Sequence, residues 1–310
     1  MVLGMKRCGI ASKFLILFCI VSLSLVSANS VRTSNAQPTG SILQLCLLLD
    51  GSSSLNGADW NTTRDSLANL VTSTIPRNGS VELAVVEFGY SSSDGYAKVV
   101  VTPTVVTETD YGDLSNQVKA LNQPGSGIST PAGIDLAWLA MKGSVNFGNS
   151  SRHVINLITE YYPAVRNYDT NSDLDQNGVV DAKDDAIAAM TAAAGQGLNE
   201  LDVEGIGMDN TTAQWFQHYV VWPQVGIIAP PFTKAGWIRT VSNATEFANT
   251  ISQDFPSIVP ELPLTTIIPI FIAATLLAVL IRRKRVLAKT KIVSKSKLRT
   301  TAPPKDLKSS

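Results

Sequence analysis

Between residues 41 and 256 the apolar positions follow two periods in turn, which predicts alternating strands and helices. Residues 41–49 form a nearly continuous apolar run that ends at Asp50, the pattern of a strand buried on both faces. Residues 59–75 instead space their apolar side chains as one face of a helix does. Further strands are predicted at residues 81–88, 97–106, 153–159 and 200–208, and further helices at residues 110–122, 131–143, 184–195 and 243–255.

This alternation predicts one α/β domain over residues 41–256, with a doubly wound, mostly parallel sheet that helices cover on both faces. The strands at 81–88 and 97–106 are expected to pair as a hairpin. In sheets of this kind ligands bind at the carboxyl ends of the strands. An aromatic group follows the strand at 200–208 and is read either as packing or as part of a partner surface: Trp215, Phe216, Tyr219 and Trp222.

The two ends of the chain are predicted to be targeting and anchoring segments. Residues 1–28 carry three basic residues, an apolar run and a Val-Ser-Ala site, which together indicate a secretory signal peptide, followed by a linker at 29–40. After a linker at 257–261, residues 262–281 hold no charge and at about 1.5 Å per residue can span the roughly 30 Å hydrocarbon core as one transmembrane helix. Residues 282–310 form a basic tail.

The basic tail sets the expected orientation. By the positive-inside rule it lies in the cytoplasm, so the protein is predicted to be a single-pass cell-membrane protein with residues 29–261 outside. The Pro-Glu-Leu-Pro run at 260–263, the apolar span and the Arg/Lys cluster resemble the C-terminal ends of archaeal surface proteins, some of which an archaeosortase processes. Leu262 stands where those motifs usually have Phe, which favours a retained anchor.

The charges are segregated along the chain. The 25 basic and 25 acidic residues give a net charge of zero, but residues 1–28 carry +3, residues 29–281 carry −13 and residues 282–310 carry +10. The basic tail lacks aromatic residues, so nothing indicates a nucleic-acid partner. With three cysteines a disulfide scaffold is excluded, and Cys46, in the first apolar run, is read as a buried small hydrophobic residue.

Five N-glycosylation sequons lie in the predicted outer segment. Their acceptors are expected on exposed loops or helix starts: Asn61, Asn78, Asn149, Asn210 and Asn243.

A carboxylate and two hydroxyl groups follow the first predicted strand. Asp50, Ser52 and Ser54 stand at alternate positions of one tight turn, so their oxygen atoms can converge. Hard oxygen donors of this kind suit Mg²⁺ or Mn²⁺. The alternative is that Asp50 and the serines only cap the following helix.

The Asp-x-Ser-x-Ser run at residues 50–54 resembles the von Willebrand factor A (vWA) domain family, whose metal-ion-dependent adhesion site (MIDAS) begins in this way. The resemblance covers residues 41–256 and implies a Rossmann-like fold. It also implies a threonine ligand before a helix, matched by Thr130, and an Asp after the next central strand, where this chain has Glu160. Because Glu is one methylene longer, its carboxylate reaches the metal, approaches it through a water, or pairs elsewhere. In such domains an acidic side chain of the partner fills the open position of the ion.

An insertion at residues 161–185 contains a second cation motif. From residue 173 to residue 184, side-chain oxygens stand at loop positions 1, 3, 5, 9 and 12 and Gly178 at position 6, the arrangement of an EF-hand calcium loop. The position-12 Asp makes the segment resemble dockerin calcium loops, although no second repeat implies cohesin binding. The alternative is a solvated acidic loop. The predicted Ca²⁺ ligands are Asp173, Asp175, Asn177, the carbonyl of Val179, Asp181 and Asp184.

These features predict a non-enzymatic, membrane-anchored surface protein that binds an extracellular protein or glycan through a divalent ion. The alternative is a structural component of the cell envelope in which both cations only stabilise the domain. A third possibility, a surface hydrolase that uses the divalent ion to activate water, lacks a candidate base. The two histidines, His153 and His218, have no Cys or carboxylate at metal-ligand spacing and are read as ordinary fold residues.

Overall fold

The computed structural model describes residues 42–91, 95–166, 170–223 and 235–259, all of which belong to one compact unit. The predicted signal peptide (1–28), the linker at 29–40, the transmembrane helix (262–281) and the basic tail (282–310) lie outside these residues. Within the described ranges no helix is long and apolar enough to cross a membrane.

A six-stranded sheet forms the centre of the domain, in the order β3-β2-β1-β4-β5-β6. All neighbouring strands are parallel except β2 and β3, which are antiparallel, so the predicted mostly parallel sheet and its hairpin are confirmed. The strands are β1 (Ile42–Asp50), β2 (Asn78–Ser91), β3 (Gly95–Thr107), β4 (Ser150–Thr159), β5 (Glu200–Ile206) and β6 (Ile238–Val241).

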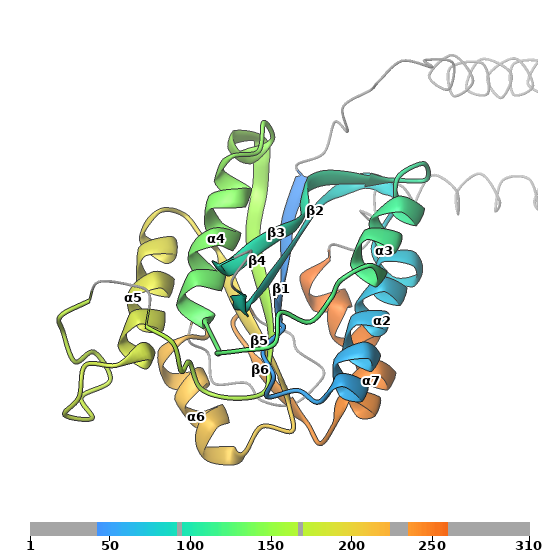
Figure 1. Ribbon diagram of the computed structural model, residues 1–310. Coiled ribbons are helices and arrows are strands. Elements are labelled where there is room, and N and C mark those ends of the chain that lie inside the picture. The colour runs from blue at the N-terminus through green and yellow to red at the C-terminus, as the bar shows by residue number, and fades with distance from the viewer. Residues whose placement is uncertain (1–41, 92–94, 167–169, 224–234, 260–310) are drawn as a thin grey trace, which may run out of the picture. The chain divides into compact units, whose positions relative to one another are not determined.

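Helices cover both faces of this sheet (Figure 1). One face carries α2 (Gly57–Ser73), α3 (Tyr111–Lys119) and α7 (Ala244–Ile258). The other carries α4 (Thr130–Lys142), α5 (Ala182–Gly195) and α6 (Asn210–Tyr219), with a short 3-10 turn, η1, at Phe147–Asn149. All nine residues of β1 are buried, because Leu45 and Leu47 pack on the first face while Cys46 and Leu48 pack on the second. This two-sided burial explains the unbroken apolar run.

Three short elements were not anticipated: η1, α6 and β6. Helix α6 carries Trp215, Phe216 and Tyr219 of the aromatic group, whereas Trp222 follows it, and strand β6 has only four residues. Trp215 and Phe216 are buried in the second core, while Tyr219 and Trp222 pack against it, so packing is the role these rings have in the fold.

Helix α4 lies unusually close to the sheet. A Cβ atom on Gly133 would lie 2.9 Å from Cδ1 of Phe88 and 3.0 Å from Cδ1 of Leu48, so only glycine permits this approach. Strands β1 and β4 end at the same edge of the sheet, called the carboxyl edge below, and α4 begins there (Figure 1). The fold thus brings the ends of β1 and β4 and the start of α4 to one edge.

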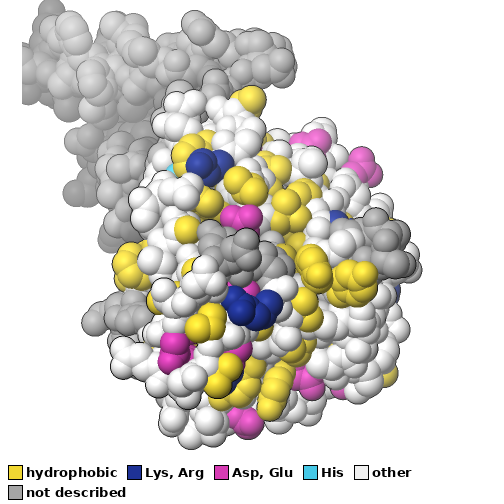
Figure 2. Space-filling model, turned by 60° about the vertical axis from the view of Figure 1, so that its left-hand side comes forward, with side chains coloured by type: hydrophobic (Ala, Val, Ile, Leu, Met, Phe, Trp, Pro, Cys, Tyr) yellow, Lys and Arg dark blue, Asp and Glu magenta, His cyan; other side chains and the backbone are white. Residues whose placement is uncertain are grey.

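The surface carries no single dominant charge on the face turned to the viewer in Figure 2. Hydrophobic side chains occur there in small groups among polar atoms, and acidic and basic side chains are interspersed. This face lacks the basic stripe that a nucleic-acid interface requires.

Candidate metal centre

Asp50 ends β1 and is completely buried at the carboxyl edge. Its Oδ1 accepts a hydrogen bond from the backbone N–H of Ser52 at 2.9 Å, and its Oδ2 accepts one from the hydroxyl of Thr159 at 2.8 Å. Thr159 is the last residue of β4, so the two central strands fix the carboxylate between them. Sequence reasoning missed Thr159, although a hydroxyl residue at the end of an apolar strand was the available signal.

The two serines of the turn lie beside this carboxylate. Their hydroxyl oxygens are 2.7 Å apart, with Ser52 buried and Ser54 exposed. The amide of Gln123 donates to the carbonyls of Ser52 and Leu55 at 2.7 and 2.8 Å and so fixes the turn from a neighbouring loop. The two hydroxyl groups therefore extend from the buried Asp50 carboxylate to the surface of the domain.

Thr130 begins α4 and is completely buried. Its hydroxyl and that of Ser129 are both buried without a hydrogen-bond partner among the described residues. A buried hydroxyl left unsatisfied costs about 1–3 kcal/mol. A bound cation would satisfy such an oxygen, so this orphaned atom fits the predicted ligand role of Thr130.

Glu160 directly follows β4 and faces the same turn. Burial raises the pKa of its carboxyl, and the charges of Asp50 and Asp59 raise it further, while a hydrogen bond with Ser54 opposes them. Its Oε2 is buried and has no hydrogen-bond partner in the described part of the chain. Burial also raises the pKa of Asp50, against hydrogen bonds from Ser52 and Thr159. The carboxyl group of Asp50 is completely buried, that of Glu160 is partly buried, and their charges repel each other, so a divalent cation would stabilise the charged forms of both.

The capping alternative for Asp50 and the serines is wrong. Helix α2 begins at Gly57, seven residues after Asp50, and its N-cap is Asn56, whose side chain accepts from the backbone N–H groups of Ala58 and Asp59 at 3.0 and 3.1 Å. The turn at 50–54 therefore serves no helix. Its oxygen donors lie beside Glu160, and Thr130 begins α4 at the same edge of the sheet, so the types of donor present suit a hard divalent ion.

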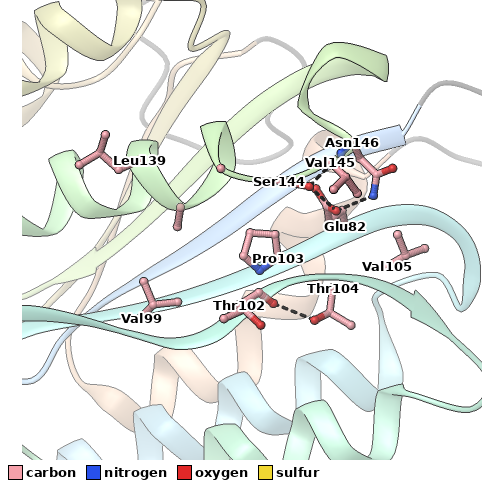
Figure 3. A pocket seen from close by; sticks show the side chains of 12 residues that line it. Glu82, Val99, Thr102, Pro103, Thr104, Val105, Leu139, Ser144, Val145 and Asn146 are labelled. Carbon is pink, nitrogen blue, oxygen red and sulfur yellow. Dashed lines mark hydrogen bonds between the residues drawn. The ribbon is translucent and has the colours of Figure 1, made fainter.

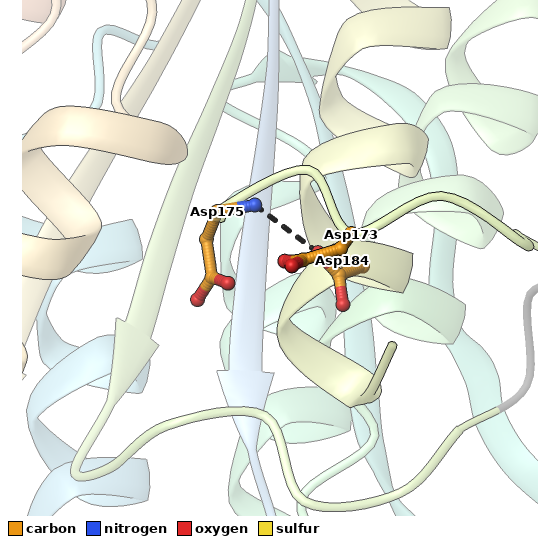
Figure 4. Close-up of side chains that lie close together, drawn as sticks. All are labelled: Asp173, Asp175 and Asp184. Carbon is orange, nitrogen blue, oxygen red and sulfur yellow. Dashed lines mark hydrogen bonds between the residues drawn. The ribbon is translucent and has the colours of Figure 1, made fainter. Parts of the chain in front are cut away.

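The predicted calcium loop brings three carboxylates together. Oxygen atoms of Asp173, Asp175 and Asp184 lie within 4.8 Å of one another, and Asp184 is completely buried (Figure 4). Gly178 has a φ of 91°, the left-handed turn that position 6 requires. Asp181 is not in this group and instead caps α5, with its side chain accepting from the N–H of Lys183 at 2.7 Å.

This loop is packed against helix α6. The indole N–H of Trp215 donates to Oδ2 of Asp175 at 3.1 Å, and the hydroxyl of Tyr219 donates to the carbonyl of Asp175 at 3.1 Å. Asn177 accepts from the N–H of Val179 at 2.8 Å within the turn. Asp184 is buried and two aromatic side chains of α6 hydrogen-bond to Asp175, so these two acids are anchored to the domain, while residues 176–179 are exposed.

The remaining predicted residues lie elsewhere. The five sequon asparagines are all exposed, although Asn61 lies within α2 and Asn78 starts a strand rather than a loop or helix. Cys46 is buried, and burial raises the pKa of its thiol. His153 stacks on Phe147 with ring centroids 4.4 Å apart, the packing role expected of it.

A separate cavity of about 670 Å³ lies between β3 and the end of α4 (Figure 3). Glu82 lines it and accepts from Ser144 and Asn146, each at 2.7 Å. Glu82 pairs with Gln44 near the start of β1, six residues before Asp50. At about 3.3 Å per residue this cavity lies roughly 20 Å from the metal site along the strand.

The family comparison agrees with this geometry. Residues 44–220 match the model of the von Willebrand factor type A domain. The chain belongs to this family. No match was found among curated proteins.

Two solved structures of a pilus adhesin share the fold of this vWA domain. The pilus adhesin SpaC from Lactobacillus rhamnosus GG has a TM-score of 0.53 at 14% identity, over 71% of this chain and 31% of SpaC. Its open conformation gives 0.51 at 16% identity, over the same shares. The manganese-loaded TRAP protein of Plasmodium vivax gives 0.45 at 17% identity, over 68% of this chain and 73% of TRAP. The chain thus spans about a third of SpaC, and the likeness concerns the fold.

Proposed function

We propose that this protein is a surface adhesin-type binding protein whose vWA domain holds a Mg²⁺ or Mn²⁺ ion and binds an extracellular partner through it. The ligands in this proposal are Asp50, Ser52, Ser54, Thr130 and Glu160. When bound, the ion would offer an open coordination position to an acidic group of the partner. We propose binding rather than catalysis, because an ion that only bridges to an acidic group of the partner needs no catalytic base from the protein.

The observation that carries the proposal is the group of buried side-chain oxygens at the carboxyl edge, of which the hydroxyl of Thr130 and Oε2 of Glu160 have no hydrogen-bond partner among the described residues. A buried Asp50, a buried Thr130 hydroxyl without a partner in the described residues and the unpartnered Oε2 of Glu160 are costly unless a cation is bound. The adhesin named in the structural comparison has the same fold, which is compatible with this role.

We also propose a structural Ca²⁺ at the loop of residues 173–184. Asp173, Asp175 and Asp184 would supply carboxylates, with Asn177, Val179 and Asp181 completing the shell directly or through water. The close packing of this loop on α6 supports a structural role.

Metal titration of the full-length chain tests both sites. Calorimetry with Mn²⁺ and Ca²⁺ should resolve two binding events in the wild type. Asp50→Asn keeps the shape of the side chain and should remove the Mg²⁺/Mn²⁺ event only, while Asp173→Asn should remove the Ca²⁺ event only, so each variant is the control of the other. Undiminished Mn²⁺ binding by Asp50→Asn contradicts the proposed adhesion site.

The second candidate is a structural envelope component in which both ions only stabilise the fold. The tight packing of the acidic loop on Trp215 and Tyr219 favours it, since a cation there would rigidify the domain. It predicts a large gain in melting temperature with metal and no partner whose binding depends on Asp50.

For localisation we propose a single-pass membrane protein. Removal of residues 1–28, a transmembrane helix at 262–281 and a cytoplasmic tail at 282–310 would place the vWA domain outside the cell, where its five exposed sequon asparagines would be open to glycosylation.

A further inference from the structure

Three exposed tyrosines surround the candidate metal site at the carboxyl edge. Tyr90 and Tyr96 are each 41% exposed, and Tyr161 is 50% exposed. Among the described residues they are the exposed large aromatic side chains, and the strands place all three at the edge where Asp50 ends β1. The other large exposed apolar side chains are aliphatic: Leu139, Val145, Leu174 and Val179.

Tyr90 and Tyr96 form one side of this rim. Tyr90 lies near the end of β2, two residues after Phe88, whose carbonyl accepts from the N–H of Gly51 at 2.7 Å. The hydroxyl of Ser126 donates to the carbonyl of Tyr90 at 3.0 Å, which joins Tyr90 to the loop that also contacts Gly51. The rings of Tyr90 and Tyr96 have centroids 5.3 Å apart and are inclined at 44°. They therefore support each other beside the metal turn.

Tyr161 forms the other side. It follows Glu160, and its carbonyl accepts from the hydroxyl of Thr159 at 3.4 Å, the same hydroxyl that donates to Asp50. Its ring meets that of Tyr162 edge-on at 5.2 Å, and Tyr162 in turn packs on Trp215. The exposed ring of Tyr161 is thus held by a packed aromatic group beneath it.

The sheet order places these rings on opposite sides of the metal site. Tyr90 and Tyr96 belong to β2 and β3, Tyr161 follows β4, and β1 lies between. With strands about 4.8 Å apart, the distance from β2, which carries Tyr90, to β4 is about 10 Å. A ligand that touches both sides and the metal must be longer than a single sugar or amino acid.

Several polar side chains are exposed at the same edge as the rings. Ser53, Ser54, Asn56 and Ser126 are exposed at this edge. A protein hot spot usually sets its aromatic residues among other apolar contacts that exclude water. Flat rings beside hydroxyl and amide groups instead match a sugar, whose C–H faces stack on aromatic rings while its hydroxyls need hydrogen-bond partners.

Charge narrows the class of sugar. The metal position calls for an anionic group, and a carboxylate is the hard oxygen ligand it prefers. Asp50 and Glu160 of the metal site and the nearby Asp59 together bring three negative charges, however, which one divalent ion does not fully offset, so they oppose a densely anionic chain. The complementary ligand is mostly neutral, with isolated carboxylates.

We propose, on the basis of the metal-dependent binding proposed above, that this edge binds an oligosaccharide carrying an isolated carboxylated sugar. The carboxylate completes the coordination of the ion, and the neighbouring neutral sugars stack on Tyr90 and Tyr161, with Tyr96 supporting Tyr90.

An array of immobilised oligosaccharides, neutral and carboxylated, tests this with the full-length chain in Mg²⁺. We expect retention of carboxylated members only, loss of retention with a chelator, and loss when the carboxyl group is reduced to an alcohol. Tyr90→Ala and Tyr161→Ala should each weaken binding about tenfold. Tyr→Phe at these positions should retain most of the affinity because the ring remains, while Tyr→Leu should behave as Ala. Val145→Ala, 93% exposed in the turn after α4, is the matched control.

Mn²⁺ binding measured on the same preparation separates this inference from the proposed function. If the chain binds Mn²⁺ but retains no carboxylated sugar, or instead retains an immobilised Asp-containing peptide, the glycan assignment is wrong. The proposed metal site is then unaffected. Retention that survives Tyr→Ala overturns the role of the rings. A chain without Mn²⁺ binding at Asp50 overturns both.

Discussion

At the scale of single residues, the polar atoms near Asp50 do not satisfy one another. A buried hydroxyl without a hydrogen-bond partner costs free energy that a methyl group of the same shape avoids. Other buried hydroxyls of the described residues, such as that of Thr63, carry the same cost, but Thr130 begins α4 at the edge where Asp50 ends β1. Thr130 keeps its hydroxyl at a completely buried position where it has no partner within the described ranges. A role as a metal ligand gives this atom a partner that the protein alone does not provide.

Thr130→Val tests that role directly. Valine has the same shape without the hydroxyl, so without metal the variant should be more stable, with a free energy of unfolding about 1 kcal/mol above that of the wild type. Mg²⁺ affinity should fall at least tenfold, because one ligand is lost. Denaturant unfolding in chelator and calorimetric titration measure the two effects.

Thr63→Val is the matched control. Thr63 is equally buried and its hydroxyl also lacks a partner in the described structure, but it lies on α2. Thr63 completes the sequon of Asn61, so the comparison is made in a host without N-glycosylation. There the Thr63→Val variant should have a higher free energy of unfolding and an unchanged metal affinity. Equal Mg²⁺ affinities in Thr130→Val and wild type would exclude Thr130 as a ligand.

At the scale of elements, the calcium loop should stabilise α5 and α6 together. Asp173 accepts from the N–H of Asn177 through Oδ1 at 3.1 Å and from the N–H of Gly178 through Oδ2 at 2.8 Å. In Asp173→Asn the one remaining side-chain oxygen can accept from Gly178, while the N–H of Asn177 keeps Oδ1 of Asp175 as its acceptor at 3.2 Å. The variant should therefore melt like the wild type in chelator. When the Ca²⁺ concentration is a hundred times Kd, the free energy of unfolding of the wild type should rise by about 2–3 kcal/mol, and that of the variant should not rise.

Scanning calorimetry in Ca²⁺ and in chelator measures this difference. Asp65→Asn, at the exposed surface of α2, changes the net charge by the same amount and is the control. A Ca²⁺-induced gain that persists in Asp173→Asn would rule out the loop.

Strand β5 buries three acids beneath α7. Glu200, Asp202 and Glu204 alternate with apolar residues, the pattern of a strand with one solvated face, yet all seven residues of β5 are buried. Arg152 pairs with Glu200, and Arg239 pairs with Asp254 of α7. Burial raises the pKa of Glu204 well above its ordinary value, and the charge of Asp254 raises it further against the attraction of Arg239.

Glu204→Gln should therefore stabilise the domain at high pH. A raised folded-state pKa gives stability that is complete below the unfolded value of about 4.3 and is lost as the pH rises through the folded value. Glutamine stays neutral, so we expect a gain of about 1 kcal/mol or more at pH 8 that shrinks toward pH 5. Denaturant unfolding at both pH values measures it. Glu108→Gln, whose side chain is 75% exposed, should show no such trend, and a pH-independent difference would refute the burial argument.

Helices and strands whose own burial sets a clear period of apolar residues could be predicted from the sequence. Short elements that exist only because they pair with a neighbouring strand could not. The unbroken apolar run of β1 and the helical spacing of α2 each report how many faces are covered, so both were found from sequence. Strand β6 is too short to show a period and is defined by pairing with β5. For the same reason Asp50, Ser52 and Ser54 of one turn were predicted together, while Thr159 depended on the pairing of β1 with β4.

At the scale of the whole molecule, the zero net charge hides an acidic domain. The −13 of residues 29–281 includes Asp50 and Glu160 of the proposed adhesion site and Asp173, Asp175 and Asp184 of the calcium loop. These acids repel one another at close range, and divalent ions would offset part of that repulsion. The segregation of charge therefore favours two linked roles, cation binding by the domain and membrane orientation by the +10 tail.

That orientation gives a prediction for intact cells. If the tail is cytoplasmic, a tag placed after Ser310 should survive protease added outside, while residues 29–259 should be digested or released. N-terminal sequencing of the mature protein should begin at Asn29. Eleven basic residues within the last 29 make the opposite orientation unfavourable, since they would have to cross the bilayer and leave the anionic inner leaflet. Cleavage of the tag in intact cells, with a lysed sample as the control for protease access, would reverse the proposed topology and place the adhesion site inside the cell.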